Sequence, residues 1–332
     1  MLCPAITANP LRVDFFILHL SYDVGMAKVK FGYILPTESL QQRDMASYAE
    51  TIHRALEIIS GSFASFWAID HLQDGESPMI EGFTTLAFLA EAHPRLKFGT
   101  TVISQVFRNP ALLAKMAATL QFLSGGRFIL GIGAGGQEEE SRAYGYDFSP
   151  GTVRVEQLEE TLQIIRAMWT ENRATFEGKH YRVKDAYCVP KPEPVPPVAI
   201  GAFGPGMLRL TAKYADWWNP SSAGPRSYRR MSEALDRACR EIGRDPVTVK
   251  RMWSGGIAIA RTPEKAEALA QVRLRSDEDD YGFIGTPERI AEQMRLFIDL
   301  GVTYFLLGFE GFPNLDPLEL FVNEIAPALN GM

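Results

Sequence analysis

Cysteine, long apolar runs and excess positive charge are all scarce in this chain of 332 residues, and each shortage excludes a class of protein. The three cysteines, Cys3, Cys188 and Cys239, are odd in number and far apart, without a Cys-x-x-Cys pair or a nearby pair of histidines. This pattern argues against a disulfide framework and against a zinc site. We therefore expect no bound metal.

Membrane and nucleic-acid functions also lack support. The longest apolar run near the start, Phe15 to Leu20, is interrupted by His19 and falls well short of the roughly 20 residues that cross a bilayer. The 34 basic residues are outnumbered by 40 acidic ones, which gives a net charge of -6. Nucleic acids and anionic membranes attract a basic face, which only a local patch could supply here. We expect a soluble, cytoplasmic protein that binds neither nucleic acid nor membrane.

The first 27 residues do not fit the pattern of the rest. From Met26 the chain reads MAKVKFGYILP, which looks like a natural start that leads directly into a first strand. We interpret residues 1–27 as an N-terminal extension that is poorly ordered or that reflects a misplaced start. A signal peptide is the competing interpretation, but Arg12 and a short apolar stretch without a small-x-small cleavage site argue against it.

The most informative stretch runs from Asn109 to Gly145. It contains a helix with apolar residues at three- and four-residue spacing, a Ser-Gly-Gly turn, an unbroken apolar strand at Phe128 to Leu130, and a glycine-rich exit at Gly131, Gly133, Gly135 and Gly136. The helical stripe comprises Leu112, Leu113, Met116, Ala117, Leu120 and Leu123. Bare backbone at the end of a buried strand is typical of the place where parallel α/β folds bind ligands.

Strand-like and helical patterns alternate over the remaining length, which is typical of parallel βαβ units. About eight strands are expected, and their number predicts a (β/α)8 TIM barrel, an α/β fold, over residues 28–330. The candidates are Lys30 to Leu35, Ser65 to Ile69, Lys97 to Ser104, Arg127 to Gly133, Val198 to Ala202, Trp217 to Pro220, Ser254 to Ala260 and Thr303 to Phe309.

Helix starts and two irregular segments complete this organisation. Thr262-Pro263-Glu264 and Thr286-Pro287-Glu288 each offer a hydroxyl N-cap followed by proline at the first helical position. Ala174 to Pro197 is expected to be an insertion between helix 4 and strand 5, with a hairpin and a stiff proline-rich lead. Arg273 to Tyr281 is acidic and polar, and is either a solvated loop or a lid.

With these residues laid out, the chain resembles the luciferase-like family of (β/α)8 oxidoreductases, which use FMN or the deazaflavin coenzyme F420. The resemblance begins near Lys30 and depends on the order and spacing of several pieces. These are FWAIDH at Phe66 to His71, KFGTTV at Lys97 to Val102, RNPALLAKMAATL at Arg108 to Leu120, SGGRFILGIGAG at Ser124 to Gly135, and YADWWN at Tyr214 to Asn219. The Asp-His, Arg-Asn-Pro and GIGAG pieces favour the F420-dependent branch, with FMN as the alternative cofactor.

The resemblance implies a site at the ends of the second and third strands. His71 would lie beside the cofactor ring as the catalytic residue, with Asp70 in the cofactor site, whereas a structural histidine bonded to Asp70 or to backbone is the alternative. Family members hold the bond that corresponds to Thr101-Val102 as a non-prolyl cis peptide behind the ring. Two β-branched residues in an ordinary strand are the alternative there.

The glycine-rich exits of the fourth and fifth strands complete the implied cofactor site. Gly133 and Gly135 would leave room for the ring. Free N–H groups of Gly201, Ala202, Phe203 and Gly204, together with Asn219 and Ser221 after the sixth strand, would hold its phosphate, and a simple tight turn is the alternative.

Position 136 departs from one branch of the family. Its sugar-phosphate-oxidising members carry a catalytic glutamate where this chain has Gly136, which argues against sugar-phosphate oxidation by the same mechanism. We interpret the following Glu138, Glu139 and Glu140 as a solvated helix start, with Glu140 paired to Arg154.

Several aromatic residues and Arg108 have weaker assignments. Tyr33, Phe107, Trp217 and Trp218 line a pocket or belong to the core, and Arg108 is expected to be a structural partner of the next loop.

The function implied is an F420-dependent oxidoreductase that transfers hydride between the deazaflavin and a small organic substrate. An FMN-dependent luciferase-like monooxygenase is the alternative, and a flavin-binding barrel without turnover is the third hypothesis. By analogy with related barrels, we expect a homodimer formed through helices near the second and third strands.

Overall fold

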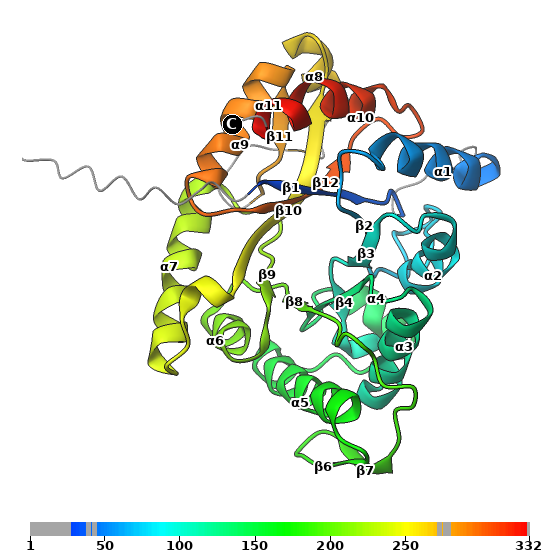
Figure 1. The fold of residues 1–332 in the computed structure, drawn as a ribbon, viewed down its shortest axis with the longest axis vertical. Helices are drawn as coiled ribbons and strands as arrows, with labels where there is room; N and C mark the ends of the chain where they lie inside the picture. Colours follow the sequence, from blue (N-terminus) through cyan, green and yellow to red (C-terminus); the bar gives the residue numbers. More distant parts are fainter. Residues whose placement is uncertain (1–27, 38–40, 42–44, 271–273, 275–279, 331–332) are drawn as a thin grey trace, which may run out of the picture.

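The computed structural model describes residues 28–37, 41, 45–270, 274 and 280–330. The proposed N-terminal extension, residues 1–27, lies outside the described residues, as does most of the Arg273–Tyr281 segment. Parallel strands form a ring at the centre of the molecule, and helices surround it (Figure 1).

Eight parallel strand positions close the barrel, and their order around it follows their order in the sequence. They are β1 (Lys30–Ile34), β2 (Ser65–Ala68), β3 with β4 (Lys97–Thr100, Ile103–Ser104), β5 (Phe128–Gly133), β8 (Val198–Ile200), β9 (Trp217–Trp218), β10 (Lys250–Ile259) and β12 (Tyr304–Phe309). Closure follows from the pairing of β9 with β10 and of β12 with β1. The predicted (β/α)8 TIM barrel is confirmed.

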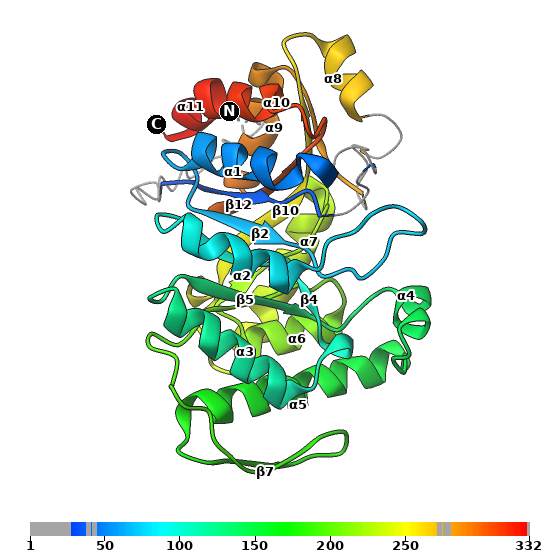
Figure 2. The same ribbon diagram turned by 90° about the vertical axis from the view of Figure 1, so that its right-hand side faces the viewer.

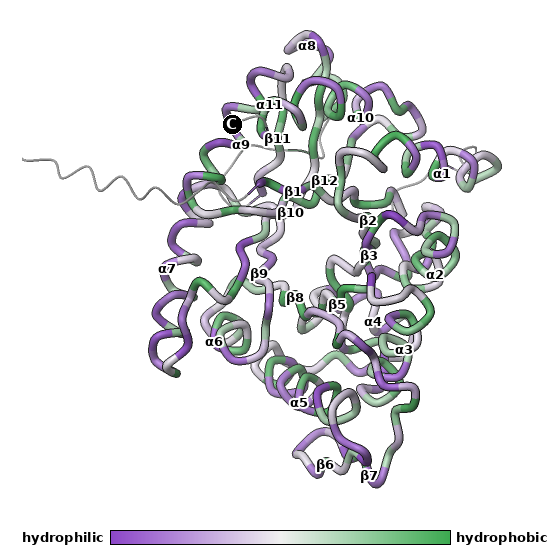
Figure 3. The backbone as a smooth tube through the Cα atoms, in the orientation of Figure 1, coloured by the Kyte–Doolittle hydropathy of each residue, from purple (hydrophilic) through white to green (hydrophobic). Residues whose placement is uncertain are grey.

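Helices cover the outside of this barrel and, with the strands, form layers in the perpendicular view (Figure 2). They are α1 (Tyr48–Ile59), α2 (Gly82–Ala92), α3 (Pro110–Leu123), α4 (Glu138–Ala143), α5 (Gly151–Thr170), α6 (Pro205–Tyr214), α7 (Pro225–Glu241), α8 (Pro263–Ala270), α9 (Pro287–Ile298), α10 (Asp316–Leu320) and α11 (Ala326–Asn330). Hydrophobic and hydrophilic residues alternate at short intervals along them (Figure 3), as expected for helices that bury one face.

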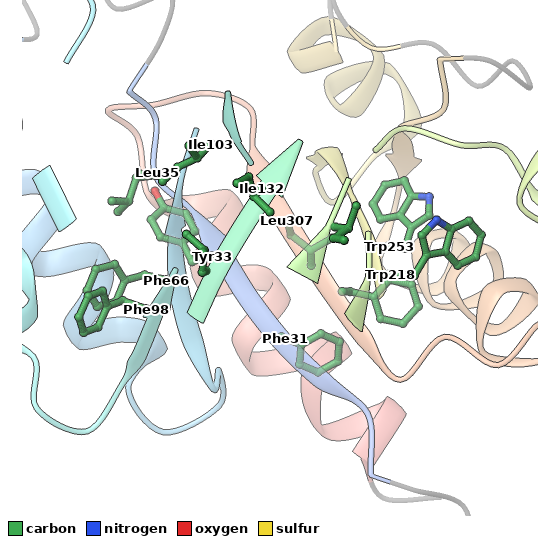
Figure 4. Packing of buried hydrophobic residues seen from close by; sticks show 14 of the residues in the cluster. Phe31, Tyr33, Leu35, Phe66, Phe98, Ile103, Ile132, Trp218, Trp253 and Leu307 are labelled. Atoms are coloured by element: carbon green, nitrogen blue, oxygen red, sulfur yellow. The ribbon is translucent and has the colours of Figure 1, made fainter. Parts of the chain in front are cut away.

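The outer core lies between the helices and the outward faces of the strands. Phe66 of β2 stacks on Phe98 of β3 (Figure 4), and their ring centroids are 5.7 Å apart. Phe98 in turn contacts Phe128 of β5, and Phe83 of α2 packs on the edge of Phe128. These aromatic contacts hold α2 against β2, β3 and β5, and the carboxyl ends of these strands carry much of the candidate site.

Strand boundaries depart from the sequence expectations at three places. The third predicted strand breaks at Thr101–Val102, where the peptide bond is cis, as the family resemblance implies. The seventh begins at Lys250 instead of Ser254, because Lys250 and Arg251 pair with β9 despite their charge. The short strand β11 (Phe283–Gly285), which pairs with β10, was not predicted, because three residues are too short for a periodic pattern.

The insertion before β8 is confirmed. Strands β6 (Ala174–Glu177) and β7 (Arg182–Ala186) form the predicted antiparallel hairpin, and the proline-rich lead follows them with cis bonds at Val189–Pro190 and Glu193–Pro194. Three backbone N–H groups of the hairpin turn donate hydrogen bonds to the Glu160 carboxylate of α5. The hairpin is thereby fixed to α5.

Both predicted helix starts at Thr-Pro-Glu are present, but only one hydroxyl acts as a cap. The Lys265 N–H donates to Thr262 Oγ1 at 3.4 Å. Thr286 makes no such bond, because its hydroxyl donates to Glu288 Oε2 at 2.8 Å instead. The predicted cap at Thr286 is therefore wrong.

The stripe predicted for α3 is only partly buried. Leu113, Ala117 and Leu120 face the core, whereas Leu112 and Leu123 at the two ends of the stripe are exposed. Six residues at helical spacing span a wider arc than the core covers, so its edge remains in solvent.

Candidate active site

A cavity of about 640 Å³ opens at the carboxyl ends of the barrel strands. Eleven of the twelve residues predicted for the site line it: Asp70, His71, Thr101, Val102, Gly133, Gly135, Gly201, Phe203, Gly204, Asn219 and Ser221. They come from the ends of β2, β4, β5, β8 and β9, which parallel closure brings to one edge of the barrel.

Ala202 is the exception among these residues. It is fully buried and does not line the cavity, and its carbonyl accepts a hydrogen bond from the Trp218 indole at 3.0 Å. The side chain of Ala202 therefore takes no part in the cavity, and its predicted contribution through the backbone N–H group stays a prediction.

The glycines of the site are required by close approach. A Cβ on Gly133 would lie 2.9 Å from Val102 Cγ2, and a Cβ on Gly201 would lie 3.0 Å from the same atom. Gly135 has a φ of +83°, and a Cβ there would lie 2.7 Å from Ser104 Oγ. The bare backbone at these strand ends therefore makes room for the Val102 and Ser104 side chains as well as for the cavity.

Several polar atoms at the cavity have no partner among the described residues. Asn219 donates from Nδ2 to Thr101 Oγ1 at 2.9 Å, but its buried Oδ1 is unpaired. The buried Oγ of Ser104 is also unpaired. Buried polar atoms are paired in nearly all native structures, and these two unpaired atoms belong to residues that line the cavity.

Asp70 does not bond His71. Its carboxylate accepts two bonds from the Arg108 guanidinium, at 2.7 Å and 2.8 Å, and one from the Ser104 N–H at 2.9 Å. Arg108 also donates to Glu81 Oε1 at 2.7 Å. Arg108 is thus a structural residue as expected, but its partners precede it in the chain instead of lying in the next loop.

His71 is held from a position that sequence reasoning missed. Its Nδ1 lies 3.0 Å from Glu140 Oε2, and Glu140 is buried, with 6% of its side chain exposed. The other carboxylate oxygen, Oε1, accepts hydrogen bonds from the Leu72 and Gln73 N–H groups. The interpretation of Glu140 as a solvated residue is therefore wrong, although Glu138 and Glu139 are exposed as expected.

Arg154 is not the partner of Glu140 and lines the cavity itself. Its Nη1 donates to the Ser149 carbonyl at 2.5 Å, and its guanidinium carbon lies 3.9 Å from the centre of the Phe148 ring. Its Nε is buried and has no partner among the described residues. In the sequence, only the predicted pairing with Glu140 singles out Arg154, and that pairing does not indicate a place at the cavity.

Two helix N-termini meet at the same wall. Helix α6 begins after Gly204 and α5 begins at Gly151, and neither N-terminus has a side-chain cap. A Cβ on Gly206 of α6 would lie 3.5 Å from Val155 of α5, so the helices start close together. Uncapped N–H groups and the positive ends of two helix dipoles favour an anion at this wall.

Of the four aromatic candidates, only Phe107 lines the cavity. Trp217 lies inside the barrel against Trp67 and Tyr304, near the amino ends of the strands. Trp218 faces Tyr228 of α7, and Tyr33 contacts Phe309 in the outer core. Burial within the barrel wall, which the sequence cannot distinguish from burial at a pocket, accounts for the difference.

Gly136 is exposed and lines the cavity, and a Cβ built on it would meet no atom within 4 Å. Position 136 itself therefore carries no carboxylate. Three other structural features bear on function: no described helix is both long and apolar enough for a membrane span, the described residues hold no cluster of metal ligands, and Cys188 and Cys239 are free thiols.

Comparison with known proteins gives the family. Residues 29–282 match the model of the luciferase-like monooxygenase family, and this chain belongs to it. An F420-dependent glucose-6-phosphate dehydrogenase of Kineococcus radiotolerans is 30% identical over 281 residues, which cover 83% of this chain and 74% of that protein.

Two further proteins extend the comparison. A phthiodiolone/phenolphthiodiolone dimycocerosates ketoreductase of Mycobacterium tuberculosis is 37% identical over 202 residues, 59% of this chain and 52% of the relative. Among solved structures, an F420-dependent secondary alcohol dehydrogenase in complex with an F420-acetone adduct has a TM-score of 0.79. That structure is 21% identical and covers 91% of this chain and 99% of its own, which shows the shared barrel fold.

Proposed function

We propose that this protein is an F420-dependent oxidoreductase that transfers hydride between the deazaflavin and a small organic substrate, with His71 as the group that moves the proton. The observation that carries the proposal is the cavity at the carboxyl ends of the strands, where His71, unpaired polar atoms and an anion-binding wall meet. The similarity to the Kineococcus radiotolerans dehydrogenase and to the secondary alcohol dehydrogenase, both of which are F420-dependent, supports the same cofactor.

The residues at the cavity fit such a cofactor. Asn219 Oδ1 and Ser104 Oγ can bond the polar edge of its ring, and Gly133 and Gly201 leave the Val102 side chain free to support one face. Arg154 and the backbone from Gly201 to Gly204, at the N-terminus of α6, can hold its phosphate. Asp70 holds this arrangement through Ser104 and Arg108.

The bound deazaflavin would supply the chemistry of accepting or donating a hydride. The protein would orient the substrate carbon toward it and would give or take the matching proton at His71. One-third of the His71 side chain is exposed, and the residue lines the cavity, so a substrate hydroxyl or carbonyl can reach the ring. This arrangement suits an alcohol–ketone pair.

Gly136 bears on the choice of substrate. The Kineococcus radiotolerans relative is named for glucose 6-phosphate, but this chain has no carboxylate at position 136, where the resemblance implies one in sugar-phosphate oxidation. We therefore propose a substrate other than a sugar phosphate.

Cofactor titration tests this proposal. Cofactor-free protein is titrated with F420 and with FMN, and the bound form is then mixed with a panel of secondary alcohols and ketones, with and without oxygen. We expect tight F420 binding, oxygen-independent hydride transfer, and a rate about 10²–10⁴-fold lower for His71→Ala. Binding of FMN alone with oxygen-dependent turnover would instead identify a monooxygenase. Binding without turnover, equal in both proteins, would identify a non-catalytic barrel.

We also propose a homodimer, formed through the outer surface of α2 and α3. Phe88 on α2 and Leu112, Phe122 and Leu123 on α3 are large apolar side chains that are more than half exposed, and a second copy of the chain would remove their apolar area from water. Sedimentation velocity should give a dimer for the full chain and a monomer for Leu123→Glu. A wild-type monomer at all concentrations would refute the proposal.

A further inference from the structure

The Glu140 carboxylate occupies an unusual position for a residue in an acidic helix start. Helix α4 opens with three consecutive glutamates, and the first of these, Glu138, is exposed and pairs with Arg142. Glu140 turns in the opposite direction and buries its carboxylate against the loop that follows β2. Tyr144, at the end of the same helix, donates from its hydroxyl to the Leu72 carbonyl at 2.9 Å. Helix α4 therefore holds the loop that carries His71 through Glu140 in its first turn and through Tyr144 at its C-terminal end.

The contacts of Glu140 determine the hydrogen position on His71. A carboxylate can only accept hydrogen bonds, so the 3.0 Å contact between Glu140 Oε2 and His71 Nδ1 requires a proton on Nδ1. In the neutral ring, Nε2 then carries the lone pair. Among the described residues Nε2 has no bonding partner, and the side chain borders the cavity. The ring therefore offers an acceptor to whatever occupies the cavity.

We infer that Glu140 is a positioning residue that fixes the orientation and tautomer of His71, so that Nε2 acts as the proton acceptor in the oxidation of a substrate alcohol. This inference rests on the proposed function. In the forward step, the substrate C–H bond breaks and its hydride, with both electrons, goes to the deazaflavin. The substrate O–H proton goes to Nε2, and the carbonyl product forms. The resulting imidazolium faces the Glu140 carboxylate, and the reverse reaction returns the proton from Nε2.

The two backbone N–H groups at Oε1 make a sharp test available. In Glu140→Gln the amide oxygen must remain with the Leu72 and Gln73 N–H groups, because the amide nitrogen cannot accept from them. The NH₂ group then faces His71 Nδ1 and donates to it. Nδ1 becomes the acceptor and the ring proton moves to Nε2. One isosteric change therefore inverts the tautomer while retaining the contacts of the loop.

The first experiment observes this inversion without any cofactor or substrate. The protein has five histidines, so the ¹⁵N-imidazole spectrum of histidine-labelled protein can be assigned to His71 by its loss in His71→Ala. At a pH where the ring is neutral, we expect a Nδ1-protonated ring in the wild type and a Nε2-protonated ring in Glu140→Gln. Glu139→Gln, an exposed change on the same helix, should leave the spectrum unchanged. The same tautomer in the wild type and in Glu140→Gln would refute the inference even if the enzyme proves active.

The second experiment asks whether Glu140 acts through His71. Single-turnover hydride transfer is measured for Glu140→Gln, His71→Ala and the double variant, each saturated with F420. We expect Glu140→Gln to lower the rate at least about 10-fold, and by no more than the loss of His71 itself, with little change in F420 affinity. In the His71→Ala background the same change should cost less than about 2-fold.

Other outcomes have distinct meanings. An equal loss in both backgrounds would mean that Glu140 only holds the loop, and the inference would be wrong. Glu140→Asp keeps the charge, and partial recovery relative to Glu140→Gln would support the carboxylate as the active feature. If the wild type binds F420 but transfers no hydride to any substrate, the proposed function fails, whereas the tautomer measurement still decides the role of Glu140.

Discussion

The two ends of this barrel differ in how they treat buried polar atoms. At the amino ends of the strands, Trp67, Trp217 and Tyr304 fill the interior with rings 5.3–6.4 Å apart. The polar atoms of Trp67, Tyr304 and Ser65 are paired with one another. The Trp67 indole donates to Ser65 Oγ at 2.5 Å, and the Tyr304 hydroxyl forms a hydrogen bond of 2.7 Å with the same oxygen. Burial raises the pKa of Tyr304 to about 12, so this hydroxyl stays neutral.

At the carboxyl ends the same strands surround an open cavity, and Ser104 Oγ, Asn219 Oδ1 and Arg154 Nε lack partners among the described residues. A closed end with paired atoms contributes to stability, whereas unpaired atoms reduce stability until a ligand bonds them. The contrast indicates that the closed end contributes to stability and that the open end binds a ligand. Substitutions at one end should therefore change the free energy of unfolding, and substitutions at the other should change cofactor affinity.

The largest effect is expected from Trp67→Ala at the closed end. Trp67 is fully buried inside the barrel, and its truncation should lower the free energy of unfolding by about 3–5 kcal/mol. F420 affinity of the folded protein should change little. Urea unfolding and fluorescence titration measure the two quantities. Phe203→Ala, at the open end and 54% exposed, serves as the control and should change stability by less than about 0.5 kcal/mol. A large loss of affinity in Trp67→Ala would show that the ends are not separable.

Arg154→Gln should have the next largest effect, this time on binding. A charged hydrogen bond contributes about 1.5–3 kcal/mol, so F420 should bind about 10- to 100-fold more weakly. Arg154→Lys should lie between the two, because lysine keeps the charge but loses the planar fork. Arg142→Gln, an exposed change on α4, is the matched control. Equal F420 affinity for Arg154→Gln and the wild type would show that Arg154 does not hold the cofactor phosphate.

A matched pair of serine changes compares the ends directly. Ser65→Ala leaves the Trp67 N–H and the Tyr304 hydroxyl without their partner and should destabilise the fold by about 1–3 kcal/mol. Ser104→Ala removes a hydroxyl that has no partner in the described structure, so stability should stay equal or rise. F420 affinity should fall about 2- to 10-fold only for Ser104→Ala. The opposite pattern would mean that the unpaired atoms do not face the cofactor.

The sequence predicted most of the open end and little of the closed one. Glycine runs and an Asp-His pair at strand ends are local signals, and His71, Gly133 and Gly201, which they single out, line the cavity. The position of Trp217 depends on which face of a two-residue strand turns inward, and no periodicity survives over two residues. Glu140 and Arg154 were missed for a related reason: a charged residue at a helix start resembles a solvated one until the partner across the fold is known.

The smallest predicted effect concerns the network that supports the open end. Glu81 accepts bonds from the Phe83 and Thr84 N–H groups at the start of α2 and pairs with Arg108, which holds Asp70. Partial burial alone would raise the pKa of Glu81, but the bonds from Thr84 and Phe83 and the Arg108 charge outweigh it and hold this pKa below its usual value. Because the folded-state pKa is depressed, the stabilisation is present at neutral pH and is lost as the pH falls through the folded value.

The change Glu81→Gln should therefore cost about 0.5–1 kcal/mol at pH 7, since the carboxylate is partly exposed and screened by solvent. The difference from the wild type should shrink progressively as the pH falls below the ordinary glutamate value of 4.5. Urea unfolding at a series of pH values measures this convergence, with the exposed change Glu76→Gln as the control. A gap that stays constant with pH would mean that Glu81 acts through the shape of its side chain and not through its charge. In that case the support of Asp70 by Arg108 would be independent of the acid at the start of α2, and the open end would keep its geometry at low pH.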